Sequence, residues 1–288
     1  MADKTTDELL SLTNDYVFRR VFGEENVDSL AVFLSAVFDL PPDELGHLIV
    51  DDPNLHKEKE SGKSGELDIR VHKTSGEIIN VEIQVNPEKA FRERIAYYND
   101  RVFTGQLKEG DSYQKLNKAI TVVITEFTLI PETPDCTNGF QWYNISNGIK
   151  LTDKQQINIL ELSKLPDTDD GTKLWSWLTL LTLRREDEME ALAGDNKAMK
   201  DVVVTLRRMS ADEAERRLAE AREKEQRDRK AEIEYGIDEG FAKGLEQGLE
   251  QGLEEGLLTA ARNLKEAGAE KALILKATGI SEEEYTNL

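Results

Sequence analysis

Two neighbouring runs of the sequence, residues 67–72 and 79–85, alternate apolar and polar side chains. A period of two is typical of β-strands whose faces meet different surroundings, and Thr74, Ser75 and Gly76 between the runs favour a turn. The sequence therefore predicts an antiparallel hairpin. Its core face would carry Leu67, Ile69, Val71, Val81, Ile83 and Val85, and its other face would carry Asp68, Glu82 and Gln84.

The pairing register follows from the same pattern. Directly opposed residues in an antiparallel pair have position numbers with a constant sum, which is 150 if Asp68 faces Glu82 and 152 if it faces Gln84. Both even sums keep apolar residues together, whereas an odd sum would mix the two faces. We therefore predict a loop of three or five residues, with Gly76 in a left-handed conformation.

Carboxylates gathered on one strand face need a physical reason. Two carboxylates in close approach raise each other's pKa, because ionising both costs free energy. A divalent cation between Asp68 and Glu82 would remove that cost. Metal binding would explain the pair, although the spacing alone does not favour it over the alternative. The alternative is a solvated polar face that happens to be acidic, which is common in antiparallel sheets.

An ordered series of segments stands out along the chain: residues 12–23, Gly65-Glu66-Leu67-Asp68, Asn80-Val81-Glu82-Ile83-Gln84, residues 97–101, and residues 106–111 with Tyr113. This series resembles the Rpn family of recombination-promoting nucleases and transposases, within the PD-(D/E)XK nuclease superfamily. The resemblance covers roughly residues 10–190. The series is more specific than any one of its motifs.

The resemblance implies a metal-dependent DNA endonuclease. Asp68, Glu82 and the backbone carbonyl of Ile83 would hold Mg²⁺, with Mn²⁺ as a possible substitute, and Asp68, Glu82 and Gln84 would be the catalytic residues. The sequence departs from the superfamily pattern at two places: Gln84 stands where Lys is usual, and Glu66 stands at a Pro-like position. Since Gln84 carries no charge, it can only orient or weakly polarise the attacking water.

Basic residues near the site would contact DNA, and the candidates are Lys89, Arg92, Arg94 and Arg101. The formal net charge of −20 argues against a nucleic-acid partner. Residues 86–118 are locally slightly basic, however, with seven Lys or Arg against five Asp or Glu. The pattern indicates weak, transient contact with DNA.

Composition limits the class of protein. A chain of 288 residues with 39% hydrophobic content can build a true core. A single cysteine, Cys136, excludes an internal disulfide framework and suits a reducing compartment, and the N-terminus lacks an apolar signal core. We therefore expect a cytoplasmic protein without a membrane segment.

The expected fold is α/β, with a mixed sheet flanked by helices like the restriction-endonuclease core, and an α-helical C-terminal extension. We expect helices near 13–23, 26–38, 89–108, 174–183 and 202–206, and strands at 119–125 and 157–162 beside the hairpin. The predicted domains are residues 1–190 for the nuclease-like domain, 191–258 for a charged, glycine-containing tail, and 259–288 for a small helical module.

The tail has an unusual repeat. Residues 207–235 hold nine basic and nine acidic residues, typical of a solvated helix, and Gly recurs at every fourth position from Gly236 to Gly256, each followed by Ile, Phe or Leu. Small residues at this spacing would let two helices approach closely with a right-handed crossing, which predicts homo-oligomerisation through the tail. The alternative is a flexible tether, since each Gly costs a helix about 1 kcal/mol.

The last segment predicts short helices with a capping box from Ser281 to Glu284. A DNA-reading helix-turn-helix is disfavoured because its second helix would begin Glu282-Glu283-Glu284, so a packing or docking module is preferred. For the whole chain, the alternative to a nuclease is a catalytically weak, nuclease-like scaffold that acts as a binding or assembly protein through its tail. Retention of both Asp68 and Glu82 favours the nuclease.

Overall fold

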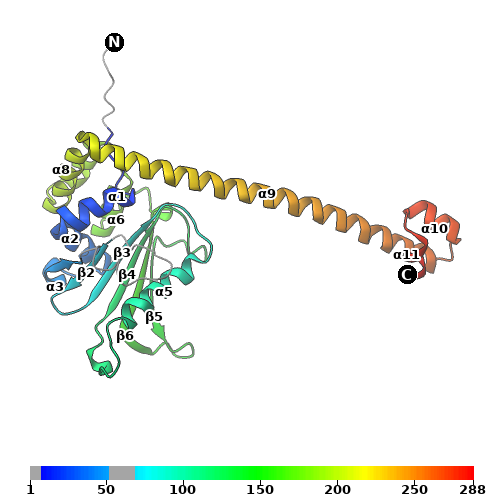
Figure 1. The fold of residues 1–288 in the computed structure, drawn as a ribbon, viewed down its shortest axis with the longest axis horizontal. Coiled ribbons are helices and arrows are strands. Elements are labelled where there is room, and N and C mark those ends of the chain that lie inside the picture. The colour runs from blue at the N-terminus through cyan, green and yellow to red at the C-terminus, as the bar shows by residue number, and fades with distance from the viewer. Residues whose placement is uncertain (1–7, 52–68) are drawn as a thin grey trace, which may run out of the picture. The chain divides into compact units, whose positions relative to one another are not determined.

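A six-stranded mixed sheet forms the centre of the fold in the computed structural model, which describes residues 8–51 and 69–288 (Figure 1). Its strands lie in the order β1-β2-β3-β4-β6-β5. They are β1 (Leu48–Val50), β2 (Ile69–Lys73), β3 (Ile78–Gln84), β4 (Ala119–Thr125), β5 (Thr137–Tyr143) and β6 (Lys150–Glu161).

The central strands β3, β4 and β6 are parallel, and the outer pairs β1/β2, β2/β3 and β5/β6 are antiparallel. Every residue of β4 is buried, as a continuous β-branched and apolar run predicts for a strand covered on both faces. The expected order of helix, hairpin, helix and strand is confirmed.

The β2–β3 hairpin has the predicted even register. Ile69 lies opposite Val81, so the position numbers sum to 150, which is the sum that was predicted to oppose Asp68 and Glu82. Lys73 N–H donates to the Glu77 carbonyl at 2.9 Å, which leaves a three-residue loop in which Gly76 has a positive φ of 95°. A residue with a Cβ at position 76 would also approach the Asn117 side chain to 2.8 Å. Asp68 itself lies outside the described residues.

Helices cover both faces of the sheet. One face packs on the main core with α1 (Asp15–Phe18), the π-helix η1 (Arg19–Glu25), α2 (Val27–Val37), α3 (Pro42–Leu45), α6 (Lys173–Thr182), α7 (Glu186–Ala193) and α8 (Lys197–Ala211). The other face packs on α5 (Phe91–Thr104) through Phe91, Ile95 and Val123. The described residues also form two short 3₁₀ helices, η2 (Tyr113–Lys115) and η3 (Leu162–Lys164).

Several element boundaries differ from the predictions. The helix predicted at 13–23 starts later, because the Asn14 side chain accepts hydrogen bonds from the backbone N–H groups of Tyr16 and Val17, and it widens into η1 after four residues. Strand β6 starts at Lys150 rather than near residue 157, since it continues as a hairpin with β5, which the sequence analysis did not foresee. The exposed residues of this hairpin lack a clean alternation.

The C-terminal part of the chain forms α9 (Glu213–Glu266), α10 (Lys271–Thr278) and α11 (Glu282–Thr286). The chain divides into two compact units between Arg227 and Asp228. In the second unit, Ala261, Ile274 and Ile280 form a small core, and the predicted capping box of Ser281 and Glu284 is present. None of the helices in the described part of the chain is both long enough and apolar enough to cross a bilayer.

Candidate active site

The carboxyl ends of the three parallel strands meet at one edge of the sheet. Gln84 of β3 lies beside Thr125 of β4, which lies beside Glu161 of β6. Glu82 lies beside Val123, whose side chain belongs to the α5 cluster, so Glu82 and Gln84 share the face that α5 covers. Ligand sites in open α/β sheets lie beyond the carboxyl ends of parallel strands, which is where these polar side chains gather.

Glu82 is the buried carboxylate of this site, with 4% of its surface exposed. Its partner is Arg94 of α5, whose two terminal nitrogens donate to Glu82 Oε1 and to Glu88 Oε2. The guanidinium also lies 5.0 Å from the centre of the Phe91 ring. Arg94 therefore shares one positive charge between two carboxylates, and the Phe91 ring packs against it.

Burial raises the pKa of Glu82, and the positive charge and hydrogen bond of Arg94 oppose that rise. Burial also lowers the pKa of Arg94, but its ion pairs with Glu82 and Glu88 more than offset this, so its pKa is raised and it stays charged. The alternative prediction, a solvated acidic face, is therefore wrong for Glu82. This carboxylate is removed from water and relies on a single cation among the described residues.

Amide groups line the turn between β3 and α5. Gln84 Nε2 donates to the Asn86 carbonyl at 3.0 Å and reaches Glu88 Oε1 at 3.4 Å. Asn86 is buried, and its Nδ2 donates to the backbone carbonyl of Gln226 in α9 at 2.9 Å. Its Oδ1 is buried and finds no hydrogen-bond partner within the described part of the chain. An unpaired buried acceptor is uncommon and is costly unless something binds it.

The same turn is strained at Ala90, which precedes α5 with φ 55° and ψ 31°. A non-glycine residue in the left-handed region costs about 1–2 kcal/mol. Such strain often accompanies functional sites. Here the turn at Ala90 sets the start of α5, and with it the position of Arg94 one turn later.

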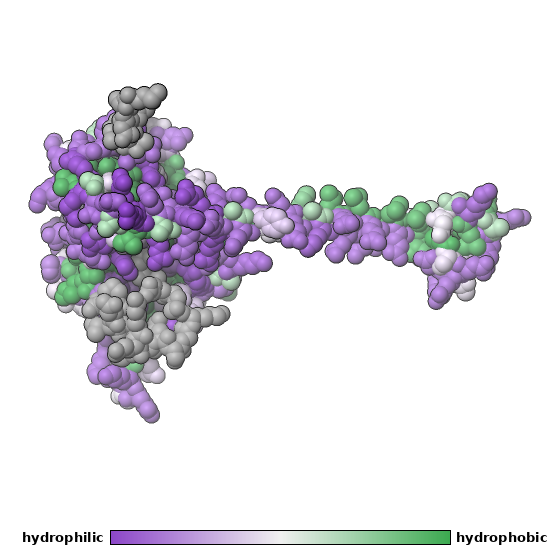
Figure 2. All heavy atoms as spheres, turned by 45° about the horizontal axis from the view of Figure 1, so that its top comes forward, coloured by the Kyte–Doolittle hydropathy of each residue, from purple (hydrophilic) through white to green (hydrophobic). Residues whose placement is uncertain are grey.

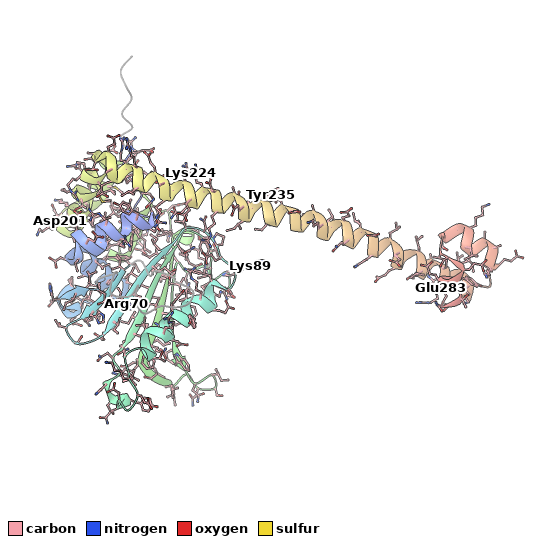
Figure 3. All side chains as sticks on the ribbon, viewed as in Figure 1. Arg70, Lys89, Asp201, Lys224, Tyr235 and Glu283 are labelled. Atoms are coloured by element: carbon pink, nitrogen blue, oxygen red, sulfur yellow. The ribbon has the colours of Figure 1, made fainter. Side chains whose placement is uncertain are left out.

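The other predicted DNA contacts differ in their surroundings. Arg92 is exposed and makes a bidentate ion pair with Glu132, at 2.9 and 2.8 Å, and it also bonds the Leu129 carbonyl. Arg101 lies over the Tyr97 ring at 5.8 Å. Lys89 is exposed in the turn before α5 and makes no ion pair with any described residue (Figure 3). Of the four, only Arg94 touches Glu82.

Ile83, the predicted carbonyl ligand, turns its side chain into the main core and pairs in register with Ile124. The predicted ligand Asp68 lies outside the described residues. No group of three His, Cys, Asp or Glu that could hold a metal ion occurs within residues 8–51 and 69–288. The described residues do offer the oxygen ligands that Mg²⁺ prefers, namely the carboxylates of Glu82 and Glu88 and the unpartnered Asn86 Oδ1.

A second buried glutamate at this edge, Glu161, is fully engaged. Its Oε1 accepts from the backbone N–H groups of Leu129 and Ile130 at 2.6 and 3.0 Å, and its Oε2 accepts from Asn138 Nδ2 and Lys164 Nζ at 3.1 and 2.9 Å. These bonds hold the chain that follows β4. Glu161 is therefore a structural residue.

The sequence analysis did not single out Glu88 or Asn86, and it treated Arg94 as one of four equal candidates. No periodic signal could have found them, because they lie in an irregular turn and on a helix that becomes a neighbour only after folding. The weak signal available was the density of polar residues directly after β3.

Comparison with known proteins gives one match. The family model described as PD-(D/E)XK nuclease family transposase matches residues 12–236. No curated protein and no solved structure matches the chain. The matched range includes the whole sheet, α5 and the first turns of α9.

Proposed function

The chain belongs to the PD-(D/E)XK nuclease family of transposases, and from that premise we propose that it is a metal-dependent DNA endonuclease. Family membership supports a nuclease-like function linked to mobile DNA. The observation that carries the finer proposal is the buried Glu82, held by a single guanidinium at the carboxyl edge of β3. A buried carboxylate with a raised pKa beside a strained turn is typical of a functional site.

In this proposal Asp68 and Glu82, with the Ile83 carbonyl, hold Mg²⁺, and Mn²⁺ can replace it. A divalent ion bound there would lower the pKa of a water molecule and neutralise charge developing on the scissile phosphate. Gln84 orients the attacking water through its side-chain oxygen, since its Nε2 is already engaged with the Asn86 carbonyl. The proposed setting is the cytoplasm, where Cys136 would remain a thiol.

Arg94 supplies the positive charge that Gln84 lacks. In the present arrangement its two terminal nitrogens are divided between Glu82 and Glu88. If Glu82 held a divalent cation, Arg94 would keep its bond to Glu88 and its other terminal nitrogen would be available to a phosphate oxygen. A planar guanidinium suits such a bidentate bridge between a carboxylate and a phosphate.

Plasmid cleavage tests the proposal. Wild-type protein should cleave DNA with Mg²⁺ or Mn²⁺ and be inactive with EDTA. Glu82→Gln and Asp68→Ala should each lower the rate by about a thousandfold, equivalent to about 4 kcal/mol of transition-state stabilisation. The matched control is Glu93→Gln, which alters an exposed glutamate on α5. Cleavage by Glu82→Gln at the wild-type rate would reject the site.

A binding measurement separates the metal from the reaction. Isothermal titration with Mg²⁺ should detect binding to wild type and to Glu93→Gln, and none to Glu82→Gln. If wild type neither binds nor cleaves with any divalent ion tested, the alternative stands: a nuclease-like scaffold that acts as an assembly protein.

We also propose that the tail self-associates. The residues that follow the first five glycines of the repeat are exposed, namely Ile237, Phe241, Leu245, Leu249 and Leu253 (Figure 2). Leu257, after Gly256, packs against the small core of the second unit. A Cβ built on any glycine from Gly236 to Gly256 would meet no described atom within 4 Å, so this side of the helix is open for close approach. An exposed apolar series of this length is typical of an interaction surface. Charging it through Leu245→Lys and Leu249→Lys should weaken the association in sedimentation experiments.

A further inference from the structure

The first turns of α9 bind the rest of the first compact unit through polar contacts along one helix face (Figure 1). The acceptors recur at every third or fourth position, and they are Glu215, the Ala219 carbonyl, Glu223 and the Gln226 carbonyl. Their donors come from separate segments of the chain and are, in the same order, Arg20, Asn14, Arg184 and Asn86. The contact at Gln226 reaches the turn between β3 and α5.

Asn86 joins this turn to α9 through its side chain. Asn86 is buried, and its Nδ2 donates to the Gln226 carbonyl at 2.9 Å. Its Oδ1 has no partner in the described part of the chain, so the bond to α9 is the one polar contact that holds the side chain there. Since the two residues lie 140 positions apart, this bond fixes the turn against a distant element.

The backbone of Asn86 in turn holds Gln84. Gln84 Nε2 donates to the Asn86 carbonyl at 3.0 Å. A side-chain amide carries its nitrogen and its oxygen in one plane, so a bond that fixes the nitrogen also restricts the direction of the oxygen. The direction of Gln84 Oε1 therefore depends on the position of Asn86, which depends on α9.

We propose that Asn86 is a positioning residue, which transmits the constraint of α9 to Gln84 and so orients the oxygen that Gln84 offers to the attacking water. This inference rests on the proposed function, because the reaction gives Gln84 its role. The nuclease unit then extends past the predicted boundary at residue 190 and includes the first turns of α9. The family match, which continues to residue 236, supports this extension.

A double-mutant cycle in the full chain tests the proposal. Asn86→Ala should lower kcat for plasmid cleavage about tenfold, because the Gln84 oxygen loses its fixed direction, and should leave KM within about twofold. In a Gln84→Ala background the same change should lower kcat by less than about twofold, since the oxygen is already absent. The matched control is Glu223→Gln, which weakens a contact of the same α9 face away from the turn and should leave kcat within about twofold.

Nuclear magnetic resonance of the Gln84 side chain provides a readout that needs no cleavage. The Nε2 amide signal is identified by its absence in Gln84→Ala. Its protons should exchange with water about tenfold faster in Asn86→Ala than in wild type or Glu223→Gln, because the turn that protects them is released. Asn86→Leu, which replaces the side chain by an apolar one of similar size, takes the place of Asn86→Ala if the latter unfolds.

Two results would overturn the proposal. One is unchanged exchange of the Gln84 amide in the Asn86 variants. The other is an equal loss of kcat on Asn86→Ala with and without Gln84, which would make Asn86 a residue of the fold alone. A wild type that cleaves no DNA would reject the proposed function separately; faster Gln84 exchange in Asn86→Ala would then still support the connection from α9 to Gln84, and unchanged exchange would reject it.

Discussion

Glu82 and Glu161 are two buried glutamates at the same edge of the same sheet, and their surroundings differ. Glu161 is 0% exposed and accepts hydrogen bonds from two backbone amides, an asparagine and a lysine. Glu82 is bonded to Arg94 and to no other described residue, and Arg94 is shared with Glu88. A carboxylate with hydrogen bonds at both oxygens stabilises the fold, whereas a carboxylate paired with one arginine remains available to bind a ligand.

The largest expected effect is on stability at Glu161. Glu161→Ala should lower the free energy of unfolding by about 3–5 kcal/mol, because it leaves the half-buried Lys164 without its counter-ion and two backbone amides without their acceptor. Glu82→Gln should change it by only about 1 kcal/mol or less, since Arg94 keeps Glu88. Urea unfolding of both variants measures the difference. Equal losses would remove the distinction between the two glutamates.

The next largest effect on stability is expected at Arg94. Arg94→Met should lower the free energy of unfolding by about 2–4 kcal/mol, because it leaves Glu82 buried without its cation. The double variant Arg94→Met, Glu82→Gln should recover part of that loss, with a coupling energy of about 1–3 kcal/mol in a double-mutant cycle. Additive effects would show that the pair does not act as a unit. Arg92→Met, at an exposed ion pair, serves as the control and should cost little.

Substitution of Ala90 by glycine is expected to stabilise the protein. Ala90→Gly should raise the free energy of unfolding by about 1 kcal/mol, because glycine adopts the observed left-handed conformation without a steric penalty. Thermal unfolding would detect this as a higher midpoint. A lower midpoint would mean that the unfolded-state entropy of glycine outweighs the strain. Asp39→Gly, at the other described non-glycine residue with positive φ, is the matched comparison.

The smallest effect concerns pH. Burial raises the pKa of Glu82 above its unfolded value of 4.5, so its contribution to stability is fully present below pH 4.5 and is lost as pH rises through the folded pKa. Wild type should therefore lose stability relative to Glu82→Gln over that window and level off above it. Urea midpoints across a pH series measure this. Parallel profiles for the two proteins would contradict the assigned direction.

Part of the site was predictable from local pattern. Alternation placed Glu82 and Gln84 on one face of a hairpin, and the parity of the register was fixed because one slip would have exposed Val81 and Ile83. The strand at 119–125 was equally clear because it is apolar throughout. The predicted helices are present but their ends differ, because the Asn14 cap moves the start of α1, and the Asn14 side chain is itself held by the distant Ala219 carbonyl.

The β5–β6 hairpin was not predictable by the same means. Its apolar residues face solvent, so burial imposed no alternation on the sequence, and the register shifts near Trp142 break the period. Pattern analysis detects strands that are half-buried within one chain. A strand whose apolar side chains are exposed on both faces gives a weaker signal.

The sequence by itself determined the core order of helix, hairpin, helix and strand, the strand face on which Glu82 lies and the even register of the hairpin, because these depend on spacing within a few residues. Tertiary structure decided three contacts: the ion pair of Glu82 with Arg94, the hydrogen bonds that make Glu161 structural, and the bond from Asn86 to the Gln226 carbonyl. Those contacts join residues 12 to 140 positions apart. Such partners are set by how the sheet, α5 and α9 pack, and no local period in the chain encodes that packing.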